Sequence, residues 1–169
     1  YQGPPFSYTF GRDSSDVFGD VNDFRNLLYV PTGVNDPLVE FAPGFDSAAF
    51  FEYVDTRGLE RGAITGRNDQ TGQWTNQFDL YLEQEFPGVQ PNHRTIGFVT
   101  VENIGNLIND DWGQVYEASF FQTTSIVDIA DSLNANGQYV YETFRDRNPE
   151  SRITDQSFWN LRLGVRYEF

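Results

Sequence analysis

From Trp159 onwards, the C-terminal segment FWNLRLGVRYEF alternates strictly between apolar side chains and polar residues or glycine. Counting back by twos from Phe169 meets only apolar residues as far as Trp159, and the intervening positions are polar or glycine. Successive Cβ atoms of a β-strand point to opposite faces, so this pattern predicts a strand with one apolar and one charged face.

Five more segments are predicted as strands, and one as a helix. The clearest strand is 74–86, and Asn136-Gly137 predicts a tight hairpin turn between two of the others. Asp46 is a good N-cap, the sequence SAAFFEYVDTR follows it, and Gly58 comes just after, so a helix is predicted between these two residues. The other strand segments are 5–10, 94–103, 114–131 and 138–144.

The predicted connections alternate between short and long. If Phe169 lies at the periplasmic end of the last strand, the three long connections 11–73, 103–113 and 145–154 all fall on the opposite side. Short turns on one side and long loops on the other are typical of an outer-membrane barrel, whose strands need only about 9–11 residues to cross. Aromatic residues near the predicted strand ends fit membrane girdles. These are Trp74, Phe86, Trp159, Tyr167 and Phe169.

The composition of the chain excludes several classes of partner and site. The chain of 169 residues has a formal net charge of −14 and contains no lysine, which argues against nucleic acid as a partner. Cysteine is absent, so disulfides, thiolate metal sites and cysteine nucleophiles are excluded. No apolar run approaches the roughly 20 residues of a membrane helix. Methionine is absent too, and we expect Tyr1 to be a processed or internal start of a longer polypeptide.

Two loops carry candidate ligand-binding residues. Oxygen ligands in the segment RDSSDVFGDVND are candidates for binding calcium, but their spacing is not that of an EF-hand, and a hydrated loop is the alternative. Asp110 and Asp111 precede Trp112 and are candidates for contacting a ligand, although a simple Asn/Asp turn also explains them. The calcium candidates are Asp13, Asp16, Asp20 and Asp23.

Charged residues on the polar strand faces are expected to face the interior of a barrel. Because buried charges need partners, we expect them to pair across strands or with a plug inside the barrel. His93 is the only histidine and has no triad or metal companion nearby in sequence, so the chain is not predicted to be an enzyme. The residues expected on the barrel wall facing the plug are Asp79, Glu83, Glu85, Arg162 and Arg166.

Four segments, in their order along the chain, resemble the C-terminal part of a TonB-dependent outer-membrane receptor of the Oar-like group, whose members carry a carboxypeptidase-regulatory-like domain. The segments are PFSYTFG…LLYVP, NQFDLYLEQEFP, VENIGNLINDDWG and the terminal VRYEF. The resemblance covers essentially the whole chain. It implies an all-β fold: an antiparallel transmembrane β-barrel segment, about the last six strands of a twenty-two-stranded barrel, with long extracellular loops, one containing a short helix.

The resemblance also implies location and partners. The chain 1–169 would lie in the bacterial outer membrane and pair with the plug and earlier strands of the same receptor, whose N-terminal part engages the TonB complex. Tyr167 and Phe169 are similar to the signal read by the barrel-assembly machinery. Calcium is the only cofactor that the sequence suggests.

The expected function is uptake of a substrate across the outer membrane, with this segment closing the barrel in contact with lipid. A peptide, protein, glycan or chelated metal all remain open as substrates. Segment 11–73 is expected to form a folded extracellular cap, because its helix and the strip LLYVP have apolar faces to bury. The alternative is a self-contained small outer-membrane barrel or an adhesin-like binding module.

Overall fold

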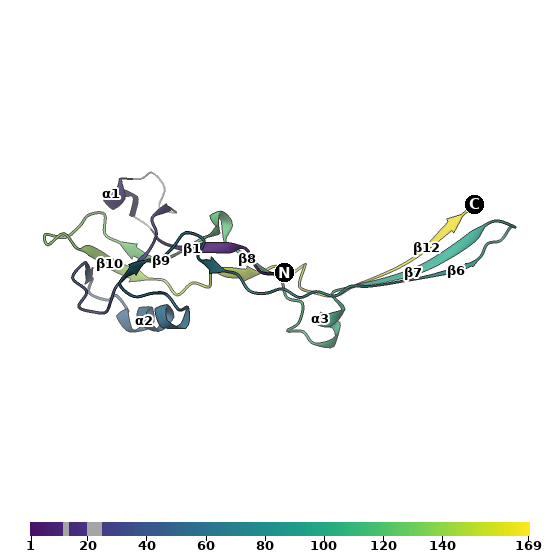
Figure 1. The fold of residues 1–169 in the computed structure, drawn as a ribbon, viewed down its shortest axis with the longest axis horizontal. Helices are drawn as coiled ribbons and strands as arrows, with labels where there is room; N and C mark the ends of the chain where they lie inside the picture. Colours follow the sequence, from purple (N-terminus) through teal and green to yellow (C-terminus); the bar gives the residue numbers. More distant parts are fainter. Residues whose placement is uncertain (12–13, 20–24) are drawn as a thin grey trace. The chain divides into compact units, whose positions relative to one another are not determined.

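The computed structural model describes residues 1–11, 14–19 and 25–169, which form two compact units. We call Tyr1–Gly3, Gln73–Glu117 and Arg152–Phe169 the sheet unit, and Pro4–Gly72 and Ala118–Ser151 the core unit. The chain is rich in strands, which make up 39% of it, and has few helices, so the predicted all-β class is confirmed (Figure 1). In the described part, no helix has the length and apolarity needed to cross a membrane.

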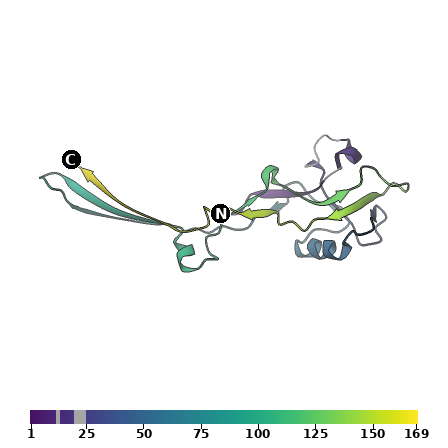
Figure 2. The same ribbon diagram turned by 180° about the vertical axis from the view of Figure 1, so that it is seen from behind.

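The sheet unit is built on three long antiparallel strands: β6 (Leu80–Pro87), β7 (Arg94–Glu102) and β12 (Asn160–Glu168). Their order is β12-β7-β6, and they run side by side in both views (Figures 1 and 2). β6 begins at Leu80, later than the predicted 74, and β12 begins at Asn160, not directly after the predicted connection 145–154. The preceding segments make other contacts: Trp74 bridges to Gln2, and the Gln77 amide donates to the backbone oxygens of Gly113 and Gln156.

Helix α3 (Ile104–Ile108) belongs to the sheet unit and directly follows β7. The short strands β8 (Tyr116–Ala118) and β11 (Glu150–Arg152) pair with each other, and the division between the two units falls within both of them. The backbone N–H of Asn103 donates to Asp79 Oδ1 at 2.8 Å, and its side-chain amide donates to the Gly113 oxygen at 3.0 Å. This buried asparagine therefore ties the end of β7 to the loop after α3.

The core unit contains a five-stranded sheet in the order β3-β10-β9-β1-β5, a two-stranded sheet of β2 and β4, and helices α1 and α2. The hairpin of β9 and β10 turns at the predicted Asn136-Gly137. Helix α2 is capped by Asp46, and Gly58 follows it with a φ of +65° that favours glycine. The bounds are β1 (Pro5–Phe10), α1 (Ser14–Phe18), β2 (Tyr29–Val30), β3 (Val39–Phe41), α2 (Ser47–Thr56), β4 (Ala63–Ile64), β5 (Gln70–Thr71), β9 (Thr123–Ile129) and β10 (Tyr139–Phe144).

Aromatic residues dominate the core of this unit. Tyr8 of β1 and Phe50 of α2 are both fully buried. Tyr53 and Val54 of α2 are buried in the same cluster. The Tyr8 and Tyr53 hydroxyls lie 3.1 Å apart, and Tyr53 donates to the Arg147 backbone oxygen at 2.8 Å. Burial raises the pKa of Tyr8, so its hydroxyl stays neutral and serves only as a hydrogen-bonding group.

Six segments were predicted as antiparallel barrel strands, and this prediction is wrong for three of them: 5–10, 114–131 and 138–144. β1 pairs in parallel with β9, β10 pairs in parallel with β3, and the side chains of β1 and β9 are mostly buried in the core unit. The predicted strand 114–131 is also interrupted, by the 3₁₀ turn η2 (Phe120–Gln122), where Phe121 and Gln122 have positive φ. Strands do lie within all three predicted segments, but a hydrophobic core of the chain itself takes up their apolar side chains.

Asp36→Asn is expected to destabilise the core unit by about 2 kcal/mol at neutral pH. The buried carboxylate is a charged acceptor, and hydrogen bonds to a charged group contribute more to stability than those to a neutral amide. Oδ2 accepts from the Tyr29 hydroxyl and from the backbone and hydroxyl of Thr32, and Oδ1 accepts from the Leu38 N–H. Burial alone would raise the pKa of Asp36, but these hydrogen bonds bring it below its usual value.

A lowered pKa stabilises the fold above the unfolded-state pKa of about 3.9, and this stabilisation is lost as the pH falls towards the folded-state value. The midpoint temperature of thermal unfolding of the core unit should therefore fall less steeply between pH 7 and pH 3 for Asp36→Asn than for the natural protein. Asp55→Asn, at an exposed carboxylate paired with Arg61, is the control. Equal pH dependence of the natural protein and Asp36→Asn would contradict the role of Asp36.

Gly164→Ala is expected to destabilise the three-stranded sheet by about 1 kcal/mol, because the new methyl group would push the Phe98 side chain out of its preferred rotamer. A Cβ at Gly164 of β12 would lie 2.2 Å from Cζ of Phe98, whose ring covers this glycine from the neighbouring strand. Gly97→Ala is the matched control, since its Cβ would meet nothing closer than 3.7 Å. The thermal midpoint of the folded protein should fall for Gly164→Ala only, and equal midpoints for the two variants would refute the close packing of Phe98 on Gly164.

Candidate functional site

One face of the three-stranded sheet is uncharged and largely apolar. Leu82, Val99 and Leu163 are directly opposite one another in the register, and the alternation repeats this match along all three strands. Leu163 is 71% exposed, and no part of the described chain covers this face. A continuous exposed apolar surface of this kind marks contact with a membrane or a partner. The face consists of Leu80, Leu82, Gln84, Phe86, Thr95, Gly97, Val99, Val101, Leu161, Leu163, Val165 and Tyr167.

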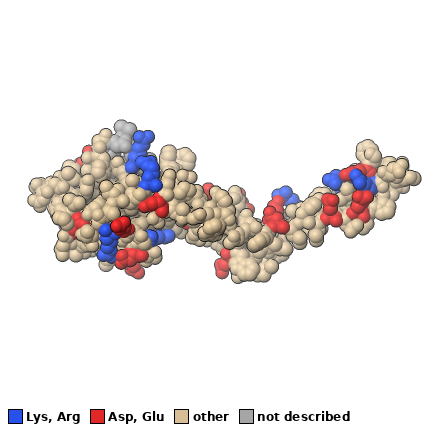
Figure 3. All heavy atoms as spheres, viewed as in Figure 1, with Lys and Arg blue, Asp and Glu red and all other residues tan. Residues whose placement is uncertain are grey.

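The opposite face carries the charges of the sheet. Arg94 lies 2.6 Å from Glu168 and 3.4 Å from Glu85, and Arg162 lies 3.0 Å from Glu102. Acidic and basic atoms adjoin on this part of the chain in Figure 3. Strand alternation places the five residues expected on a barrel wall along this face. Among them, Glu83 accepts from the Tyr81 hydroxyl, Arg166 pairs with Glu168, and Asp79, just before β6, accepts from the Asn103 backbone.

Aromatic side chains lie at both ends of the sheet. At the end formed by the β6–β7 turn, the His93 ring nitrogen Nδ1 lies 2.8 Å from the Tyr167 hydroxyl, and the His93 ring contacts the exposed Phe169. At the other end, the exposed Trp159 directly precedes β12. No partner of His93 was predicted from the sequence, because 74 residues separate it from Tyr167.

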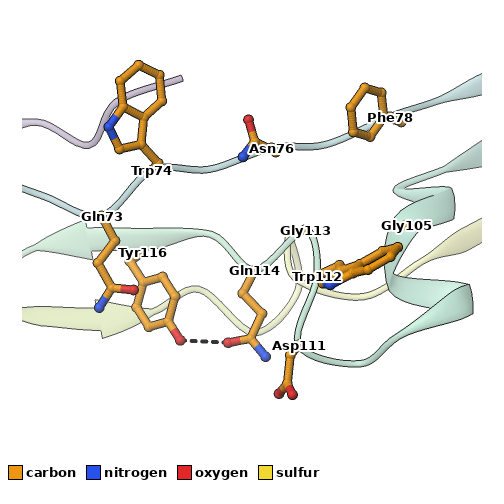
Figure 4. A pocket seen from close by; sticks show the side chains of 10 residues that line it. All are labelled: Gln73, Trp74, Asn76, Phe78, Gly105, Asp111, Trp112, Gly113, Gln114 and Tyr116. Carbon is orange, nitrogen blue, oxygen red and sulfur yellow. Dashed lines mark hydrogen bonds between the residues drawn. The ribbon is translucent and has the colours of Figure 1, made fainter.

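A pocket of about 350 Å³ lies in the sheet unit, beyond the end of the sheet where α3 begins (Figure 4). Three short segments form it: the extended chain before β6, the first turn of α3, and the loop that leads into β8. The lining residues are Gln73, Trp74, Asn76, Phe78, Gly105, Asp111, Trp112, Gly113, Gln114 and Tyr116.

The extended segment 73–78 presents its alternate residues Trp74, Asn76 and Phe78 to one side, and Trp112 lies beside Gly105 (Figure 4). Trp74 is 67% exposed and Trp112 is 54% exposed. The Tyr116 hydroxyl donates to the Gln114 side chain at 2.6 Å. Large aromatic surfaces thus stand open to solvent beside amide groups.

Buried amides hold the loop that carries Trp112. The side chain of Asn106, which is almost fully buried, donates to the backbone oxygens of Asp110 and Trp112 at 2.9 and 3.0 Å. Gln114 donates to the same Asp110 oxygen. The loop conformation is therefore fixed by the chain itself.

The structure brings together part of the candidate ligand site. Asp111 and Trp112 line the pocket, whereas Asp110 contributes a backbone oxygen that supports the loop. Trp74 and Tyr116 were not predicted as site residues, because both fall in segments that were predicted as long strands. Their aromatic character was visible, but no local signal placed two distant segments around one pocket.

The structure leaves the calcium site as a prediction. Asp16 is exposed on α1, while Asp13, Asp20 and Asp23 lie outside the described residues. Within the described ranges, no group of three or more aspartate, glutamate, histidine or cysteine side chains could hold a metal ion.

Comparisons with protein-family models, with curated proteins and with solved structures found no match for this chain.

Proposed function

We propose that this chain forms part of the wall of a TonB-dependent outer-membrane receptor of the Oar-like group, and that the parent protein takes up a substrate across the outer membrane. The observation that carries the proposal is the two-faced sheet β6-β7-β12, with an uncharged apolar face and an ion-paired polar face. In a large barrel the apolar face contacts lipid and the polar face contacts the interior.

Strand length supports a membrane position. Strands of nine residues, such as β7 and β12, extend about 30 Å at roughly 3.3 Å per residue, which is enough for an apolar band of about 25 Å. Among the residues that the structure describes, neither β6 nor β12 has a strand on its outer edge. Unpaired backbone groups cannot face hydrocarbon, so further strands of the parent receptor would pair with both edges.

Chain order supports an extracellular position for the core unit. The β6–β7 turn would lie on the periplasmic side, so the chain before β6 and the connection from β7 to β12 would both lie outside. Both segments of the core unit belong to these connections. The wall then comprises three strands of this chain, and the cap includes residues 118–151 as well as the predicted 11–73.

Two experiments separate this proposal from a self-contained barrel. The natural protein, isolated from outer membranes and sequenced by mass spectrometry, should contain a plug and a TonB box upstream of Tyr1. The chain 1–169 expressed alone should give no heat-resistant, detergent-stable monomeric barrel. A stable barrel from these residues alone would instead support the small-barrel alternative, and a plugless natural protein would refute TonB-dependent uptake.

Phe169→Ser is expected to lower the amount of assembled receptor, because Phe169 and Tyr167 end the apolar side of the last strand. The assembled fraction is measured as heat-modifiable protein in outer-membrane fractions on gels. Phe120→Ser, at an exposed aromatic residue of the core unit, serves as the control. Unchanged assembly of Phe169→Ser would count against a role of the C-terminal aromatic residues in assembly.

A further inference from the structure

We infer that the pocket formed by 73–78, Gly105 and 111–116 binds a neutral glycan chain, which, given the proposed function, is the class of substrate that the receptor admits. The inference starts from the exposed aromatic surfaces. Trp74, Phe78 and Trp112 leave more than half of their surfaces in water, although hydrogen bonds from buried Asn106 hold the loop of Trp112 in place. Exposed aromatic faces grouped around a concave site favour a ligand that covers them.

The polar groups of the pocket match hydroxyl groups. Asn76 lines the pocket with an amide that can both donate and accept hydrogen bonds, as sugar hydroxyls also do. The Gln114 amide, which accepts from Tyr116 and donates to Asp110, adds a second neutral polar group to the lining. The electron-rich faces of the tryptophan rings attract the polarised C–H bonds on the flat side of a pyranose ring. Aromatic faces beside neutral amides therefore suit an uncharged polyhydroxylated ligand better than a purely apolar one.

Charged ligands fit less well. The described residues around the pocket include no arginine, lysine or histidine, so a phosphate or carboxylate would find no counter-charge there. A quaternary ammonium group requires rings that enclose one point. In Figure 4, Trp74 and Phe78 project from one side of their segment, and the Asp111 carboxylate points away from them.

The arrangement also favours a chain over a single sugar. Trp74 and Phe78 are four residues apart on an extended segment, which corresponds to about 13 Å at roughly 3.3 Å per residue. Two platforms at this separation can contact different rings of one oligosaccharide. Because buried Asn106 fixes the Trp112 loop, little conformational entropy is lost on binding.

The test uses the intact natural protein, purified in an amine-oxide detergent because glycoside detergents would compete for the site. Soluble hexasaccharides of glucose, xylose, mannose and N-acetylglucosamine are titrated by calorimetry, with tetramethylammonium as the cationic probe. We expect at least one hexasaccharide to bind, and Trp74→Ala and Trp112→Ala each to weaken it about tenfold, equivalent to ~1.4 kcal/mol. Phe120→Ala, which removes an even more exposed aromatic residue outside the pocket, should leave the affinity unchanged.

Asp111→Asn tests for a cation site, because it removes the carboxylate that lines the pocket. Failure of every hexasaccharide to bind, or binding that neither tryptophan variant weakens, would overturn the glycan inference. Binding of tetramethylammonium that Asp111→Asn abolishes would overturn it in favour of a cation site. If the natural protein contains a plug but binds no sugar, only the glycan inference is refuted. If it binds sugar but contains no plug, only the proposed TonB-dependent uptake is refuted.

Discussion

Leu163→Arg is expected to reduce outer-membrane assembly strongly, because in the proposed receptor wall it would place an arginine on the lipid face near mid-membrane, at a cost of about 2–4 kcal/mol. Leu163 lies near the middle of β12, opposite Val99 on the uncharged face. The assembled fraction is measured by heat-modifiable migration of the receptor from outer-membrane fractions. Of the changes considered for the sheet, we expect this one to have the largest effect.

The experiment is informative because the same substitution should be harmless in water. Leu163 is exposed in the chain as it stands, and exposed surface substitutions usually change stability by less than about 0.5 kcal/mol. Val89→Arg, in the turn between β6 and β7, provides the control at an exposed apolar residue outside the sheet. If Leu163→Arg assembles as well as Val89→Arg, the apolar face does not contact lipid.

Phe50→Ala is expected to cost about 3–5 kcal/mol and to loosen the core unit, as for other large-to-small changes at fully buried aromatic residues. The Phe50 ring is fully buried and packs against Phe45, Tyr141 and Phe144, with ring centroids 5.6–6.2 Å apart. Hydrogen exchange of the amides in 47–57 is the measurement. These amides should be protected in the intact protein without ligand, and the protection should fall in Phe50→Ala.

Glu52→Ala, at an exposed position of the same helix, should leave the protection at 47–57 nearly unchanged. Full exchange within seconds in the natural protein would contradict a preformed cap. It would favour a segment that becomes ordered only on ligand binding, at an entropic cost of roughly 1–2 kcal/mol per ordered backbone residue.

The amino-acid sequence by itself determined the local elements. Alternating side chains identified most of β6 and β12, and a segment with two fairly apolar faces identified β7. Asp46 and Gly58 bounded the helix, and Asn136-Gly137 marked the hairpin turn. These features depend on side-chain direction, capping and turn geometry, which act within a few residues.

Only the tertiary structure decided which partners these elements have. β1 alternates like a half-exposed strand, yet it is buried between β5 and its parallel partner β9. The pocket joins Trp74 to Trp112, and His93 meets Tyr167, across long stretches of chain. Alternation specifies that one face of a strand is apolar, but not whether lipid or a core of the same chain covers it, because burial of apolar surface is non-directional and any apolar neighbour satisfies it.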